Sequence, residues 1–135
     1  MHSPHELLHP ARWKPTQGYA HGVAATGRMV FTGGVIGWNA EQVFETDDFT
    51  GQAAQALSAI VEILACAGAR PEHLVRLTWY VTDKREYLGS LRALGAIYKE
   101  TIGRHYPAMA LVQVVALVED RAKVEIEATA VIPQE

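Results

Sequence analysis

Two stretches of the chain carry apolar residues at the spacing of a helix. From about residue 49 to residue 67, apolar positions recur every three or four residues, which predicts an amphipathic helix. These positions are Ala53, Leu57, Ile60, Val61 and Leu64. A second helix is predicted over residues 84–102. Its apolar stripe is formed by Tyr87, Leu91, Leu94 and Tyr98.

Other stretches alternate between apolar and polar residues, which is typical of strands. The three clearest are residues 74–81, 108–115 and 123–131. Pro107 fixes the backbone angle at which the chain enters the second of them. Residues 19–25 and 29–32 lie on either side of a turn-like Thr26-Gly27-Arg28, and we expect them to form a hairpin.

The order of these elements, β-β-α-β-α-β-β, predicts an α+β fold with one sheet and two helices. Two amphipathic helices can cover only one face of that sheet. By alternation, the other face would be formed by Thr78, Tyr80, Leu111, Gln113, Val115, Thr129 and Val131. A sheet face with this many apolar residues is not usually left in water. We therefore expect a homo-oligomer that buries this face, with a pocket at the subunit junction.

Composition and charge narrow the class of protein. The chain has 135 residues, enough for one domain with a core, and a formal net charge of −3. Its longest run of basic residues is Lys84-Arg85, which argues against a nucleic-acid-binding surface. No apolar run approaches the length of a membrane span, and residues 1–14 do not resemble a secretory signal. Cys66 is the single cysteine, so we expect a reducing, cytoplasmic setting.

Three places in the sequence are candidates for chemistry, and each has an ordinary alternative. Gly33-Gly34 indicates either a bulge or a close approach of a ligand to the backbone. Glu125 and Glu127 share one face of a strand at a separation of about 6.5–7 Å, either as a solvated surface or as an acid–base pair. The corner at residues 103–108 is a strand start or a pocket wall. His2, His5 and His9 lack further ligands, so no metal site is expected.

Several short motifs together resemble the YjgF/RidA family, also called the endoribonuclease L-PSP family. They include Val30-Phe31-Thr32-Gly33-Gly34, Val81-Thr82-Asp83, Tyr106-Pro107-Ala108 and Val124-Glu125-Ile126-Glu127-Ala128. The resemblance covers about residues 18–133. It implies a chorismate-mutase-like fold with one mixed sheet, two helices on one face and a homotrimer. We therefore divide the chain into an N-terminal extension, residues 1–17, and a single domain, residues 18–135.

The resemblance also implies an activity and a set of site residues. Characterised members hydrolyse reactive enamines and imines to 2-keto acids and ammonia, in pockets between subunits, without a metal or an organic cofactor. Glu125 matches the glutamate that holds and activates water, which a carboxylate in a dry pocket can do. Gly34 matches a glycine whose backbone faces the substrate, and Tyr19 matches a pocket-lining tyrosine. The partner expected for the chain is a small-molecule substrate, with neither nucleic acid nor membrane.

The chain departs from the family pattern beside Pro107. Deaminating members have an arginine directly after Pro-Ala, where this chain has Met109, and a methionine cannot form a bidentate pair with a substrate carboxylate. Leu111 replaces a frequent cysteine, so a more apolar pocket is expected. Arg92 aligns where many members have asparagine, and our hypothesis is that it supplies the missing cation.

Two functions follow from these residues. The first is hydrolysis of an enamine or imine with an altered substrate preference. The alternative is a non-deaminase trimer that binds a small molecule, or a different enzyme on the same scaffold, because a fold does not fix a function. RNA cleavage, which the older family name suggests, is disfavoured by the acidic charge balance.

Overall fold

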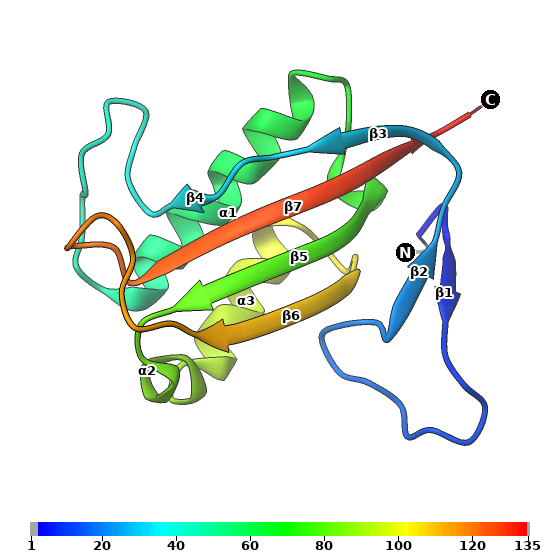
Figure 1. Ribbon diagram of the computed structural model, residues 1–135, viewed down its shortest axis with the longest axis horizontal. Helices are drawn as coiled ribbons and strands as arrows, with labels where there is room; N and C mark the ends of the chain where they lie inside the picture. The colour runs from blue at the N-terminus through cyan, green and yellow to red at the C-terminus, as the bar shows by residue number, and fades with distance from the viewer. Residues whose placement is uncertain (1–2, 135) are drawn as a thin grey trace.

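A computed structural model describes residues 3–134 of the chain. Its centre is a mixed five-stranded sheet with the strand order β3-β7-β5-β6, in which β4 also pairs with β7 (Figure 1). The strands are β3 (Gly27–Phe31), β4 (Val35–Ile36), β5 (Leu74–Val81), β6 (Ala108–Gln113) and β7 (Val124–Pro133). Only β5 and β6 run parallel; β7 is antiparallel to each of its neighbours. The expected α+β fold with one mixed main sheet is confirmed.

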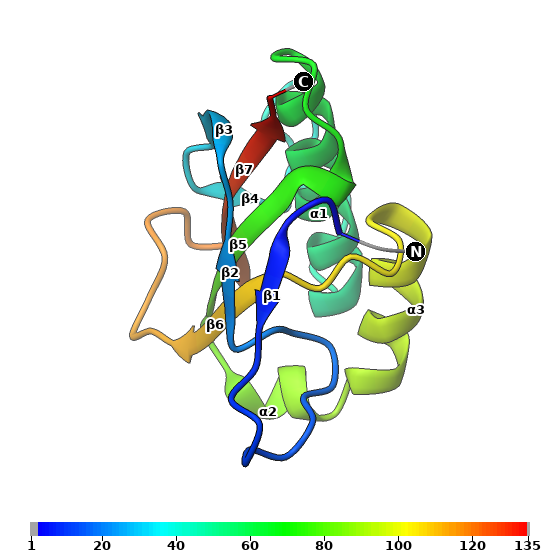
Figure 2. The ribbon, with the colours of Figure 1, turned by 90° about the vertical axis from the view of Figure 1, so that its right-hand side faces the viewer.

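Two helices cover one face of this sheet (Figure 2). Helix α1 (Phe49–Ala65) begins after Asp48, whose side chain accepts a hydrogen bond from the Gly51 N–H and so caps the helix. Its apolar stripe is fully buried at Ala53, Leu57, Ile60 and Leu64. Helix α3 (Leu91–Thr101) packs beside it through Leu94 and Tyr98. The core lies between these helices and the inner faces of β5 and β7.

The prediction of a single helix over residues 84–102 is wrong in one respect. The chain forms a short helix α2 (Lys84–Leu88), breaks at Gly89 and Ser90, and starts again as α3. Glycine favours such a break because its backbone is less restricted than that of other residues. No residue of α2 is buried, so packing does not hold the two helices in line. A short 3₁₀ helix, η1 (Pro71–His73), leads into β5.

The hairpin predicted for residues 19–25 and 29–32 does not form. Strand β2 (Gly22–Ala24) pairs with β1 (Glu6–Leu8) in a separate two-stranded sheet, and β3 pairs with β7. Gly27 explains the change of partner, because a side chain there would meet the carbonyl carbon of Ile132 at 2.8 Å. The chain can therefore lie close to β7 from its first β3 residue. Strand β1 lies within the predicted N-terminal extension and joins it to the rest of the chain; His2 lies outside the described residues.

The predicted outer sheet face also needs correction at β6. The β5–β6 register places Leu111 opposite Trp79, and Gln113 opposite Val81, and both partners are buried on the helix side. Leu111 therefore packs against the core, and the Gln113 side chain accepts a hydrogen bond from the Lys84 N–H. Alternation along β6 was predicted correctly, but the set of residues facing the helices was assigned the wrong way round. Val115 lies beyond the end of β6 and is fully exposed.

The outer face of the sheet remains partly apolar after this correction. On β3, Phe31 pairs with Thr129 of β7, and Met29 pairs with Val131. Phe31 is 65% exposed and Met29 is 58% exposed. Val112 on β6 stands beside Tyr80 of β5 and is 46% exposed. Such an open apolar surface favours contact with another protein surface.

Candidate functional site

A β-bulge separates β3 from β4. Phe31 pairs with Thr129 and Val35 pairs with Ile126, so three residues, 32–34, face only two residues, 127 and 128, on β7. The Thr32 side chain fills the irregular ladder: its Oγ1 accepts a hydrogen bond from the Ala128 N–H at 2.9 Å. A bulge bends the strand and redirects the following residues. Of the two interpretations of Gly33-Gly34, the structure shows the bulge.

The bulge brings the backbone of Gly34 against the carboxylate of Glu125. A Cβ atom added at Gly34 would lie 2.8 Å from Glu125 Cδ and closer still to Oε2, whereas one added at Gly33 would meet nothing within 4 Å. Only a residue without a side chain therefore fits at Gly34 while Glu125 keeps its position. Gly34 and Glu125 thus form one unit, although they are far apart in sequence.

Glu125 and its neighbour Glu127 have different surroundings. Both lie on the outer face of β7 and are half-buried. The Tyr80 hydroxyl donates a hydrogen bond of 2.7 Å to Glu127 Oε1, and this bond raises the pKa of Tyr80 because ionisation would break it and set a phenolate beside a carboxylate. Glu125 makes no side-chain hydrogen bond or ion pair with residues 3–134. Both carboxylate oxygens of Glu125 are therefore free of hydrogen bonds from the described residues, whereas Oε1 of Glu127 is occupied.

The start of β7 is held in place by a fully buried glutamine on α1. Gln52 Nε2 donates hydrogen bonds to the carbonyl oxygens of Arg121 at 2.9 Å and Thr46 at 3.2 Å, and its Oε1 accepts one of 2.8 Å from the Lys123 N–H. Gly37 lets the chain after β4 approach, since a Cβ there would lie 2.6 Å from the Gln52 Cα. These contacts fix the backbone two residues before Glu125.

A surface pocket of about 590 Å³ includes Gly34 and Glu125. Its other walls come from the loop after β4 and from the side of α1 next to that loop, including Trp38, Asn39, Gln55 and Ile63. The pocket therefore joins three carboxylates (Glu62, Glu119 and Glu125), three amide side chains (Asn39, Gln42 and Gln55), the bare backbone of Gly34 and apolar groups. This combination can bind a small polar molecule and move a proton to or from it.

The remaining predicted site residues lie elsewhere on the chain. Met109 stands opposite Leu77 in the register, so Met109 and Leu111 both face the helix side, whereas Glu125 faces outward. Two strand spacings separate β6 from β7, about 10 Å. Within one chain, Met109 and Leu111 therefore do not meet Glu125.

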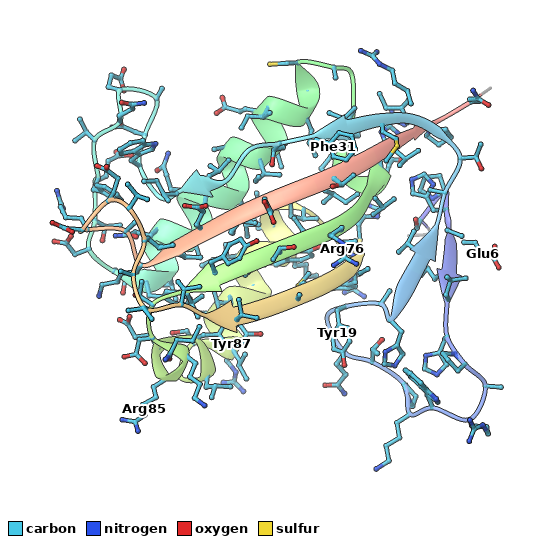
Figure 3. The ribbon with its side chains drawn as sticks, in the orientation of Figure 1. Glu6, Tyr19, Phe31, Arg76, Arg85 and Tyr87 are labelled. Atoms are coloured by element: carbon cyan, nitrogen blue, oxygen red, sulfur yellow. The ribbon has the colours of Figure 1, made fainter. Side chains whose placement is uncertain are left out.

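Arg92 and Tyr19 are both exposed. Arg92 lies in the first turn of α3, and its side chain makes no ion pair with the described part of the chain. Tyr19 is 42% exposed and lies near the start of β6 (Figure 3), because the next residue, Ala20, donates a hydrogen bond of 3.0 Å to the Pro107 carbonyl oxygen. Tyr19 thus belongs with β6 rather than with Glu125.

Sequence reasoning missed Tyr80, Gln52 and the pocket walls at Trp38 and Asn39. The Tyr80–Glu127 bond depends on the β5–β7 register, which no local pattern gives. Gln52 did carry a signal, because a polar residue next to a buried helical stripe needs hydrogen-bond partners.

Among residues 3–134, no group of three or more His, Cys, Asp or Glu side chains could hold a metal ion. His5 and His9 point to separate backbone carbonyl groups, those of His73 and Trp13. No helix among the described residues is long and apolar enough to cross a membrane.

Comparison with known proteins identifies relatives over nearly the whole chain. The family described as endoribonuclease L-PSP matches residues 10–132. A 2-iminobutanoate/2-iminopropanoate deaminase from Salmonella typhimurium is 33% identical over 116 residues, which cover 84% of this chain and 86% of that protein.

Solved structures agree with this match. A Rid-family protein of unknown function from Yersinia pestis has a TM-score of 0.84 and 30% identity, covering 95% of this chain and 98% of that one. Escherichia coli TdcF with bound serine has a TM-score of 0.66 at 30% identity, covering 94% of this chain and 98% of that one.

Proposed function

Since the chain belongs to the endoribonuclease L-PSP family, the YjgF/RidA proteins, we propose that it hydrolyses a reactive enamine or imine to a carbonyl compound and ammonia. The observation that carries this proposal is the Glu125 carboxylate, which lies against the bare backbone of Gly34, lines the pocket and accepts no hydrogen bond from residues 3–134. The name of the Salmonella deaminase supports the reaction class.

The chemistry requires one group that can both accept and return a proton. An enamine first becomes an imine by losing its N–H proton and taking up a proton at its β-carbon. Water then adds to the carbon of the C=N bond while Glu125 accepts a proton from it, and the carboxyl group passes this proton to the nitrogen. In the second step, the proton of the new hydroxyl moves by way of Glu125 to the nitrogen, the C–N bond breaks, and ammonia leaves as the carbonyl forms. A positioned carboxylate contributes about 10²–10⁴-fold to such transfers.

We place the complete site between two copies of the chain in a homotrimer. Glu125 and Gly34 face one side of the sheet, while Met109 and Leu111 face the other, so one copy alone does not gather them. The exposed apolar side chains of Met29, Phe31 and Val112 on the outer face support burial against a neighbour.

Met109 then sets a preference for substrates that depend less on a carboxylate. It is a half-buried thioether packed against the core, and it offers no hydrogen-bond donor to an anion. Arg92 is the nearest substitute by alignment, and its exposed position on α3 leaves the guanidinium available to a substrate or to a neighbouring copy.

The test is ammonia release from 2-iminobutyrate, generated in place by an amino-acid oxidase. We expect activity in the wild-type protein and a loss of at least 100-fold in Glu125→Gln, which keeps the shape of the side chain but removes the proton acceptor. Glu127→Gln is the matched control and should retain activity within about fivefold, because Glu127 is already bonded to Tyr80.

Two outcomes would contradict the proposal. Equal activity of wild type and Glu125→Gln would remove Glu125 from the reaction. No activity in wild type towards 2-iminobutyrate or an uncharged imine would favour the alternative, a trimer that binds a small molecule or a different enzyme on this scaffold.

A further inference from the structure

A second cavity lies away from the Glu125 pocket, at the other end of β5. It has a volume of about 260 Å³ and lies between the N-terminal segment, the start of β5 and the loop that joins α3 to β6. Its lining includes His5, Leu7, Leu74, Arg104, His105 and Pro107. Leu74 begins β5, while Tyr80, the register partner of Glu125, lies six residues further on, so the two sites are about 20 Å apart.

The loop that forms one wall of this cavity is firmly held. The Tyr98 hydroxyl donates a hydrogen bond to the His105 carbonyl oxygen, and the Tyr98 and Tyr106 rings stack at 5.3 Å with an angle of 13° between their planes. The carbonyl of Pro107 accepts the hydrogen bond from Ala20. Because the backbone is fixed, the side chains of Arg104 and His105 have a stable base from which to meet a ligand.

His105 carries an unused polar atom. Its Nδ1 is buried and has no hydrogen-bond partner among residues 3–134. Buried polar atoms without partners are rare in folded proteins, since each costs free energy that a bond would recover. His105 lines the cavity, so a turn of its imidazole ring that brings the Nδ1–H group to the cavity surface would give this group a ligand acceptor as its partner.

The charges around the cavity favour an anion. Arg104 is exposed, and its guanidinium makes no ion pair with the described residues. Glu72 also lines the cavity, but Arg70 Nε binds its Oε1 at 3.1 Å and offsets its charge. His5 Nε2, at 3.2 Å from the His73 carbonyl oxygen, already donates to that backbone group. Leu7 and Leu74 add an apolar surface beside Arg104.

We propose that this cavity binds a small carboxylate anion with a short apolar chain, separately from the Glu125 pocket. The carboxylate accepts hydrogen bonds from the Arg104 guanidinium and from His105 Nδ1–H, while the chain contacts Leu7 and Leu74. Charge-assisted bonds of this kind are stronger than neutral ones, and an arginine fork matches the two carboxylate oxygens. The proposal does not depend on the reaction at Glu125.

The experiment is a titration of the full-length protein with sodium propionate, followed by amide chemical shifts, at an ionic strength held constant with sodium chloride. We expect saturable shifts in residues 103–106, a dissociation constant below about 10 mM, and at least fivefold weaker binding in Arg104→Gln. His105→Ala should weaken binding as well, while its backbone bond from Tyr98 is retained.

Two variants serve as controls. Arg85→Gln removes an exposed arginine on α2, at the other end of the molecule (Figure 3), and should bind propionate like wild type. Glu125→Gln should do the same, which separates this site from the proposed catalytic one. Wild-type affinity in Arg104→Gln, shifts confined to Gly34 and Glu125, or tighter binding of inorganic phosphate than of propionate would each overturn the proposal.

Discussion

Glu125 and Met109 lie in the same sheet, but their surroundings differ. Around Glu125, a bulge, two close-packed glycines and a fully buried glutamine fix the backbone that carries the carboxylate. Around Met109 and Leu111, an edge strand carries half-buried apolar side chains, and the polar group aligned with this region, Arg92, is exposed on another element. We call the firmly held residues around Glu125 the proposed proton-transfer region, and the less constrained residues around Met109 the proposed substrate-binding region. Four substitutions test this comparison, from the largest expected effect to the smallest.

Gln52→Leu should have the largest effect on stability. The substitution leaves three partly buried backbone groups, Thr46 O, Arg121 O and Lys123 N, without their side-chain partners. We expect the free energy of unfolding to fall by about 3–5 kcal/mol, measured by urea unfolding, since each stranded buried group costs about 1–3 kcal/mol.

Gln113→Leu is the control from the other region. Its side chain makes one exposed hydrogen bond, to the Lys84 N–H, so the loss should stay below about 1 kcal/mol. Equal losses of unfolding free energy in the two variants would show that both regions are held equally firmly. That result would contradict the difference between them.

Gly34→Ala should have the next largest effect, which we expect on activity. The new methyl group would displace the Glu125 carboxylate, which is the far end of a flexible, half-buried side chain, so the substitution should affect activity more than stability. We expect ammonia release to fall by about tenfold or more, because a displaced base transfers protons poorly. Gly33→Ala, with open space around its Cβ, should change activity less than twofold. If both alanines are tolerated, Gly34 does not control the position of Glu125.

The sequence predicted the long elements because their patterns extend over many residues. Helix α1 and strands β5 and β7 each repeat one periodicity for at least eight residues, and all three form where expected. Strands β1 and β2 have three residues each, too few for a pattern, and their partners depend on the approach of Gly27 to β7. At Gly89, a helical pattern persisted through a position where the helix breaks.

The sequence could predict which residues are candidates for the site, but not how they are placed relative to one another. Motif order singled out Gly34 and Glu125, but their contact depends on one extra residue in the ladder, which alternation does not show. Leu111 was assigned to the outer face because alternation gives two sets of residues without saying which set the helices cover. The roles of the predicted site residues remain predictions that the substitutions here address.

Met109→Arg tests the proposed substrate-binding region. An arginine there would offer a bidentate partner to a substrate carboxylate, and a charge-assisted bond is worth about 1.5–3 kcal/mol. We expect kcat/KM for 2-iminobutyrate to rise by about tenfold, while Arg92→Ala in the wild-type background should lower it. Unchanged kinetics in Arg92→Ala would mean that this arginine does not replace the missing cation.

Tyr80→Phe should have the smallest effect on activity. It tests whether Glu125 acts without its neighbour Glu127. The phenol donates to Glu127 rather than to Glu125, so its loss should change ammonia release less than threefold and lower the free energy of unfolding only slightly. Since the folded state raises the pKa of Tyr80, the Tyr80 contribution to stability is complete below pH 10, the usual pKa of tyrosine, and declines as the pH rises through the raised value. The difference in stability between wild type and Tyr80→Phe, measured by urea unfolding at pH 8 and at pH 10.5, should therefore shrink at the higher pH. A large loss of activity at pH 8 would instead show that Glu127 acts with Glu125 and that the proton-transfer region extends across both strands.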